Sequence, residues 1–174
     1  MTKRNVNITI STSRIEVPEE LFDDAASPTD APFDCLHTRM PEPTHLMVEG
    51  RLVTSPSRVE LVYEEGELSG MEGSVTSVGF ERNNPGLVSM IRTGTVETAL
   101  IFEQGKRHIS VYDTPISSFE VCVQTLRVEN RLLRDGILQL DYLIEIHGAQ
   151  AEHCRMTISA RSAQSPKKVF SNIL

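Results

Sequence analysis

Strict alternation of apolar and polar residues runs through most of this chain, from about residue 45 to residue 161. A period of two marks β-strands that bury one face, because successive side chains point to opposite sides of a strand. Turn residues interrupt the alternation at short intervals, as in "RNNPG" at 82–86 and "QGK" at 104–106. No stretch after residue 45 sustains an apolar period of 3.6. The sequence therefore predicts an all-β fold of antiparallel strands.

About ten such strands are expected, and most links between them have hairpin length. Short links favour up-and-down order, and closing the sheet removes its exposed edges. A single antiparallel barrel is therefore preferred over the alternative, a sandwich of two sheets. The predicted strands cover residues 4–11, 45–53, 57–65, 74–81, 86–93, 95–103, 107–113, 118–128, 137–146 and 152–161.

Residues 12–44 break the alternation and are acidic and rich in Pro and Ala. A segment this long without regular structure is usually disordered or functional, so two interpretations stay open: a mobile acidic insert, or a docking segment or lid over the barrel mouth. The tail at 162–174 either frays or packs on the barrel or on another subunit. All 174 residues are expected to belong to one domain, 1–174.

Composition excludes several classes of function. The net charge of −7, without a cluster of Lys and Arg, argues against a nucleic-acid partner. The chain holds no apolar run long enough to span a membrane as a helix, and its start lacks the apolar core of a signal peptide. Three widely spaced cysteines (Cys35, Cys122 and Cys154) are unlike a disulfide scaffold. We therefore expect a reduced, cytoplasmic protein.

A set of short motifs runs through the predicted barrel: Tyr-Glu-Glu at 63–65, Arg-x-Gly at 92–94, Tyr-x-Thr at 112–114, Thr125 and the Asp-Tyr pair at 141–142. In order and spacing these motifs resemble those of the YwiB-like family, uncharacterised bacterial proteins classed with the calycin, or lipocalin-like, β-barrels. The likeness covers roughly residues 46–160. The resemblance implies a calycin-like barrel and brings no established chemistry. The insert at 12–44 is longer than the family's usual first connection.

The alternation also predicts which side chains share a face. Four strands have an apolar face that turns polar at its last positions, and these faces are expected to point into the barrel. Their polar ends would then gather near one end of the lumen as a ligand-binding cluster. The candidate residues are Arg92, Glu65, Tyr63, Thr125 and Tyr142, with Tyr112 and Thr114 as further members.

Arg92 is the most informative of these residues, and two roles are open to it. A buried guanidinium must be paired, and Glu65 is the obvious partner for an internal ion pair that plugs the barrel. The same planar fork could instead clamp an anionic ligand.

Metal binding and nucleophilic catalysis have little support in the sequence. Cys35 and His37, and likewise His153 and Cys154, stand without a second pair at zinc-like spacing. His153 and Cys154 are adjacent in a strand, so they should point to opposite faces. No G-x-S-x-G motif or phosphate-binding loop occurs. No metal, no cofactor and no catalytic residue is predicted.

These patterns favour a non-enzymatic protein that binds a small, anionic or amphipathic molecule in the lumen. The first alternative is a structural or interaction module with a filled barrel, acting through its surface or as a homo-oligomer. An enzyme of unknown reaction comes third. No nucleic-acid or membrane partner is expected.

Overall fold

A computed structural model describes residues 1–22 and 39–163. Ten antiparallel strands close into a barrel in the order β1-β10-β9-β8-β7-β6-β5-β4-β3-β2, so the predicted all-β barrel is confirmed. No helix in the described part of the chain is long and apolar enough to cross a membrane. The elements are β1 (Thr2–Glu16), β2 (Thr44–Thr54), β3 (Arg58–Glu64), the 3-10 helix η2 (Glu67–Ser69), β4 (Ser74–Glu81), β5 (Asn84–Gly94), β6 (Glu97–Glu103), β7 (Arg107–Asp113), β8 (Ser118–Arg131), α1 (Leu132–Asp135), β9 (Ile137–Ile146) and β10 (Glu152–Ser162).

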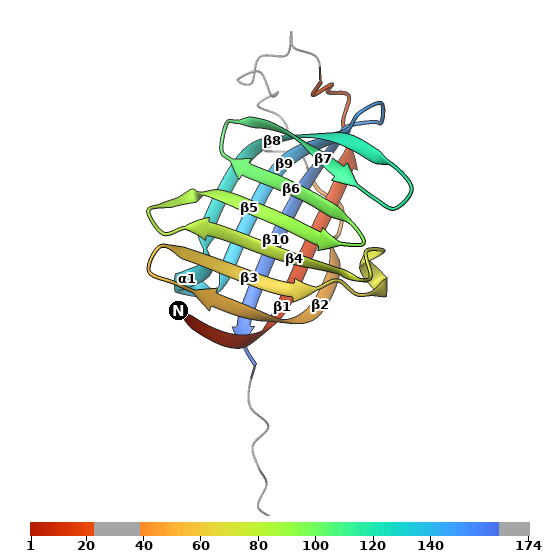
Figure 1. The fold of residues 1–174 in the computed structure, drawn as a ribbon. Helices are drawn as coiled ribbons and strands as arrows, with labels where there is room; N and C mark the ends of the chain where they lie inside the picture. Colours follow the sequence, from red (N-terminus) through yellow and green to blue (C-terminus); the bar gives the residue numbers. More distant parts are fainter. Residues whose placement is uncertain (23–38, 164–174) are drawn as a thin grey trace, which may run out of the picture.

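The barrel has two walls that cross each other steeply. In Figure 1, β2 to β6 run across the face toward the viewer, while β8, β9, β10 and β1 form the wall behind. Because the strands run up and down, their links alternate between two ends. The α1 end carries the β2–β3, β4–β5, β6–β7 and β8–β9 links, and the η2 end carries the β3–β4, β5–β6, β7–β8 and β9–β10 links.

Apolar side chains from all sides pack together inside the barrel. They form one contiguous buried cluster, in which the rings of Phe102 and Tyr142 meet edge to face with centroids 5.0 Å apart. Burial of such surface is the main stabilising contribution to a fold of this kind. The fully buried members with the largest side chains include Ile8, Leu61, Phe102, Leu138, Leu140 and Ile158.

The predicted start of the acidic insert at residue 12 is wrong. β1 continues to Glu16, and residues 12–16 pair with β10 from Thr12↔Met156 to Glu16↔Glu152. These residues lack a clean apolar alternation, but the backbone of the long strand β10 offers them a full ladder of partners. The predicted tail likewise begins one residue too early, since Ser162 still belongs to β10. The centre of the insert, 23–38, and the end of the tail, 164–174, lie outside the described residues.

Residues 17–22, here called the strap, lie on the outer face of β8 and β9. Leu21 anchors the strap: its side chain is 2% exposed and belongs to a second apolar cluster with Cys122 and Leu143. The Leu21 backbone N–H donates to Glu145 Oε2 at 2.5 Å, and its carbonyl accepts from Arg107 Nη1 at 2.7 Å. The first part of the predicted irregular segment is therefore tied to the barrel.

Candidate functional site

A polar ring crosses the inner face of the barrel near its η2 end. It consists of Tyr63, Thr76, Arg92, Thr98 and Tyr112, which are direct cross-strand partners in that order from β3 to β7. Partners opposite each other in a ladder have neighbouring side chains on the same face. The alternation of five strands therefore brings one polar residue from each into a single row.

Arg92 of this ring forms a buried ion pair with Glu65, which directly follows β3. Glu65 Oε1 lies 3.2 Å from Arg92 Nη2 and 3.3 Å from Arg92 Nε. Thr76 joins them, because its hydroxyl donates to Glu65 Oε1 at 2.6 Å and accepts from Arg92 Nε at 3.1 Å. The side chains of Arg92 and Glu65 are 9% and 2% exposed. Both charges are thus removed from water and compensate each other.

Tyr112 closes the ring on the side of the β3–β4 link. Its hydroxyl donates to the sulfur of Met71 in that link at 3.3 Å. Tyr112 is half-buried, whereas Tyr63 at the other end of the ring is buried. The link that follows η2 therefore lies against the polar ring.

Three of the predicted site residues lie elsewhere. Thr125 and Tyr142 are both buried, but they form a separate cross-strand row with Cys154 on β8, β9 and β10. Thr114 stabilises the β7–β8 turn, since its hydroxyl donates to the Ser117 carbonyl at 2.7 Å and accepts from the Ser117 N–H at 3.1 Å. The structure thus unites Arg92, Glu65, Tyr63 and Tyr112 and separates Thr125, Tyr142 and Thr114 from them.

Thr76 and Thr98 belong to the polar ring, and the sequence analysis missed both. Each follows the pattern that identified Arg92: Thr76 shares a face with Val78 and Phe80, and Thr98 is the polar residue on the inner face of β6. The Thr98 hydroxyl is buried without a hydrogen-bond partner among the described residues, as is the Thr125 hydroxyl. Applying the same rule to every strand would have found them.

Burial raises the pKa of Tyr63 and of Tyr142 above the ordinary 10.0, and the charge of Glu65 adds to the effect on Tyr63. The folded protein thus holds two phenol protons that the unfolded chain loses above that pH. We expect the free energy of unfolding to fall as the pH rises above about 10, since the native state then binds more protons. Denaturant titrations at about pH 8 and about pH 11 measure the effect. Tyr63→Phe and Tyr142→Phe should reduce it, and an undiminished fall in both variants would contradict this origin.

Of the four residues considered as metal ligands, the structure describes His153 and Cys154, and these two point to opposite faces of β10. His153 lies on the outer face of β10 and contacts Asp141 Oδ1 at 2.5 Å, while Cys154 points inward toward Tyr142. Cys35 and His37 lie outside the described residues. In the described part of the chain, no three His, Cys, Asp or Glu side chains are arranged to hold a metal ion.

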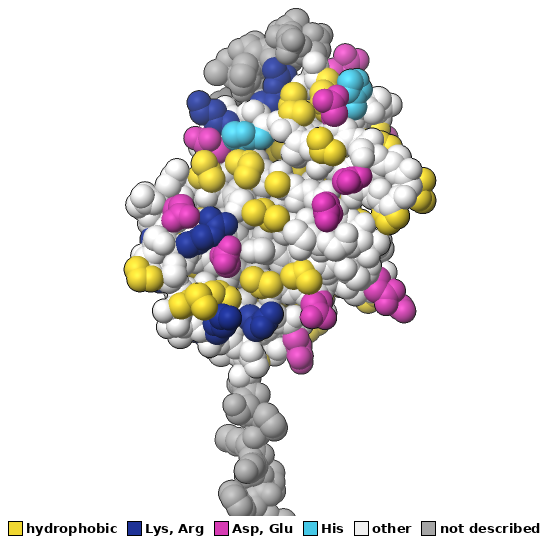
Figure 2. Space-filling model, in the orientation of Figure 1, with side chains coloured by type: hydrophobic (Ala, Val, Ile, Leu, Met, Phe, Trp, Pro, Cys, Tyr) yellow, Lys and Arg dark blue, Asp and Glu magenta, His cyan; other side chains and the backbone are white. Residues whose placement is uncertain are grey.

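The outer surface carries an apolar patch over β5, β6 and β7, visible toward the viewer in Figure 2. Ile109 and Val111 of β7 are 60% and 55% exposed, and Ile91 of β5 is 38% exposed. An apolar surface of this kind on a sheet commonly marks an interaction site. We call it the apolar face; its residues are Ile91, Ala99, Ile101, Ile109 and Val111.

Comparison with known proteins agrees with this architecture. A family described as a domain of unknown function (DUF1934) matches residues 36–158. The chain is also similar to the crystal structure of the ywiB protein from Bacillus subtilis, with a TM-score of 0.61 and 15% sequence identity over 92% of this chain and 94% of that chain. At this identity the likeness concerns the fold alone. No curated protein matches the chain.

The family match covers most of the chain, including all strands from β2 to β9. It agrees with the resemblance found in the motifs from Tyr63 to Tyr142. This chain therefore belongs to the DUF1934 family of YwiB-like barrel proteins.

Proposed function

We propose that this protein is a non-enzymatic interaction module with a filled barrel, and that its apolar face binds a second copy of the chain. The apolar face carries the proposal. The inner surface of the barrel is occupied by packed side chains and by the paired charges of Arg92 and Glu65. Exposed Ile109 and Val111, by contrast, have no packing of comparable extent. The surface is therefore the better place for recognition.

Charges at the two ends of the β6–β7 hairpin support a second copy as the partner. Glu97 and Asp113 are direct cross-strand partners at one end, where two like charges repel each other. Lys106 and Arg107 lie at the other end, beside the hairpin turn. A twofold axis through the apolar face would bring the acidic end of each copy to the basic end of the other. Such a contact is self-complementary, as a symmetric dimer requires.

The test is the oligomeric state of the purified chain. We expect a dimer by light scattering, and we expect Ile109→Lys combined with Val111→Lys to give a monomer with an unchanged circular dichroism spectrum. Two lysines desolvated in an apolar contact would cost far more than the contact provides. Lys106→Glu should weaken the dimer, and Lys106→Glu with Glu97→Lys should restore it.

Leu68→Lys is the matched control, because Leu68 is 93% exposed and lies on η2, outside the apolar face. This variant should stay dimeric. A monomeric wild-type protein at about 100 μM would overturn the proposal, because stable specific interfaces have far lower dissociation constants.

Binding of a small polar molecule in the lumen is the second candidate function. The buried hydroxyls of Thr98 and Thr125, which have no hydrogen-bond partner among the described residues, favour it, since buried polar groups usually have such partners. In this case Arg92 would act as a clamp for the anionic part of the ligand. The two candidate functions assign different roles to Arg92. In a filled barrel it contributes to the stability of the fold, whereas in a ligand site it contributes to the affinity for the ligand.

We further propose a cytoplasmic location and a place among the calycin-like barrels. Cys122 and Cys154 are both buried free thiols, which suits a reducing compartment. Burial raises the pKa of Cys122 to about 11 and that of Cys154 to about 12, so both thiols are unreactive at neutral pH. The up-and-down strand order and the crossing of the two walls support the calycin-like assignment.

A further inference from the structure

A small pocket opens at the α1 end of the barrel, away from the polar ring and the apolar face. Its volume is about 270 Å³, and it lies between the β4–β5 hairpin and the junction of β8 with α1. Three of its lining residues are arginines, and none of the described lining residues is acidic. The lining consists of Arg82, Arg131, Arg134, Asn130, Phe80, Pro85 and Leu133. We call it the basic pocket.

Hydrogen bonds fix both sides of the basic pocket. Asn130 of β8 donates its Nδ2 to the Pro85 carbonyl at 3.0 Å and accepts the Leu132 N–H on its Oδ1 at 3.2 Å. This one side chain therefore ties the β4–β5 hairpin to the start of α1. On the opposite side, Arg82 Nε donates to the Ser55 carbonyl at 2.8 Å. Walls held in this way need little rearrangement to receive a ligand.

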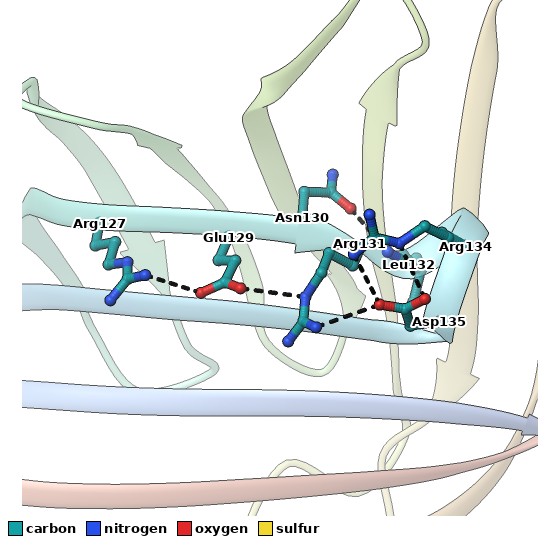
Figure 3. A network of polar contacts seen from close by, with 7 residues as sticks. All are labelled: Arg127, Glu129, Asn130, Arg131, Leu132, Arg134 and Asp135. Carbon is teal, nitrogen blue, oxygen red and sulfur yellow. Dashed lines mark hydrogen bonds and ion pairs between the residues drawn. The ribbon is translucent and has the colours of Figure 1, made fainter.

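The arginines of the basic pocket are incompletely neutralised. Figure 3 shows a chain of ion pairs along β8 into α1: Arg131 lies 3.2 Å from both Glu129 and Asp135, and Arg134 contacts Asp135 through two bonds of 3.0 Å. Arg82 donates to a backbone carbonyl and not to a carboxylate. Arg127, Arg131 and Arg134 share the two carboxylates of Glu129 and Asp135, so positive charges outnumber negative ones in this network even without Arg82. On a chain with net charge −7, this local excess is unusual.

Apart from the arginines and Asn130, the lining is apolar. Leu133 is 44% exposed at the pocket, Phe80 is buried beneath it, and Pro85 is exposed at its edge. Guanidinium groups beside apolar surface suit a molecule with an anionic head and an apolar body, because Arg forms bidentate bonds with planar or tetrahedral oxyanions. We propose that the basic pocket binds a small organic oxyanion, a carboxylate or a phosphate carried on an apolar body. This proposal is independent of the proposed dimer.

The test is an NMR titration of the ¹⁵N-labelled full chain with four probes: phenyl phosphate, phenylacetate, inorganic phosphate and benzyl alcohol. We expect saturable shifts of the backbone amides of Arg82 and of residues 131–135, and of the Asn130 side-chain amide, with at least one of the two aryl oxyanions. The probe that binds more tightly identifies the head group. Inorganic phosphate and benzyl alcohol should each bind at least about tenfold more weakly than this probe. The first lacks the apolar body of the proposed ligand, and the second lacks its anionic head.

The variants separate the pocket from general attraction of anions. Arg82→Gln with Arg134→Gln should raise the dissociation constant about tenfold or more. Arg14→Gln is the control, because Arg14 is 62% exposed near the η2 end and should leave binding unchanged. Leu133→Glu, which adds a carboxylate at the pocket, should also abolish binding. Absence of saturable shifts in the wild-type chain, or equal weakening by Arg14→Gln, would overturn the proposal.

Discussion

Arg92→Ala should lower the free energy of unfolding by about 3–5 kcal/mol, since removing one partner of a buried ion pair leaves an uncompensated charge. The charge left without a partner is that of Glu65, whose side chain is 2% exposed. The neutral hydroxyl of Thr76, which donates to Glu65 at 2.6 Å, cannot replace a guanidinium. Equilibrium unfolding in urea, followed by circular dichroism, measures the loss.

A double variant distinguishes the effect of the unpaired charge from the effect of lost side-chain packing. Arg92→Met with Glu65→Leu removes both charges and keeps apolar volume, so it should be clearly more stable than Arg92→Ala alone. Arg14→Ala, at an exposed ion pair, should cost less than about 1 kcal/mol. A loss below about 1 kcal/mol for Arg92→Ala would contradict a structural ion pair. If that variant also released a small molecule detected by native mass spectrometry, Arg92 would be a ligand clamp.

Leu21→Ala should destabilise the protein by about 2–5 kcal/mol and expose Cys122 to alkylation. Leu21 is 2% exposed in the cluster formed by the strap and the outer face of β8 and β9, so truncation leaves a cavity there. Cys122 Sγ lies 3.5 Å from the Leu21 carbonyl, beneath the strap. Burial is the main cause of the raised pKa of Cys122, about 11, so release of the strap should bring it toward the ordinary 9.0.

Urea unfolding measures the loss of stability in Leu21→Ala, and iodoacetamide labelling with peptide mapping measures the exposure of Cys122. A much larger thiolate fraction at about pH 8 should speed the labelling of Cys122. Leu133→Ala is the matched control, because the same truncation at a side chain that is 44% exposed should change stability by less than about 1 kcal/mol. Unchanged labelling of Cys122 in a destabilised Leu21→Ala variant would show that the strap does not protect this thiol.

The alternation of apolar and polar residues predicts whether a side chain lies on the inner or the outer face of the barrel better than it predicts the position of that side chain along the barrel axis. It placed Arg92, Glu65 and Tyr63 on the inner face, where they are buried. Thr125 and Tyr142 are also on the inner face, but they lie in another cross-strand row. Side-chain parity is a property of one strand, whereas height depends on the stagger between strands. The pairing of β8 with β9 includes a register shift between Thr125 and Arg127, and the local sequence pattern does not predict this shift.

The strap shows a second limit of prediction from sequence. The absence of alternation predicts one irregular segment over residues 12–44. Their first part instead continues β1 and then packs Leu21 against the outside of the barrel. A single apolar residue that fills an external pocket leaves no periodic signal, and the pocket itself exists after the barrel has formed. Contacts of this kind become visible only in three dimensions.

The ladder between β6 and β7 is short, and this favours local opening of the barrel between these two strands. It holds two residue pairs, Glu97↔Asp113 and Thr98↔Tyr112, whereas β1 and β10 share a ladder from Val6 to Glu16. Local opening requires the least free energy where the fewest backbone bonds must break. Transient separation of β6 from β7 would turn the closed cylinder into a curled, still continuous sheet. Solvent would then reach Arg92 and Glu65 through this side wall without global unfolding, so the centre of the molecule can exchange with its surroundings faster than its overall stability implies.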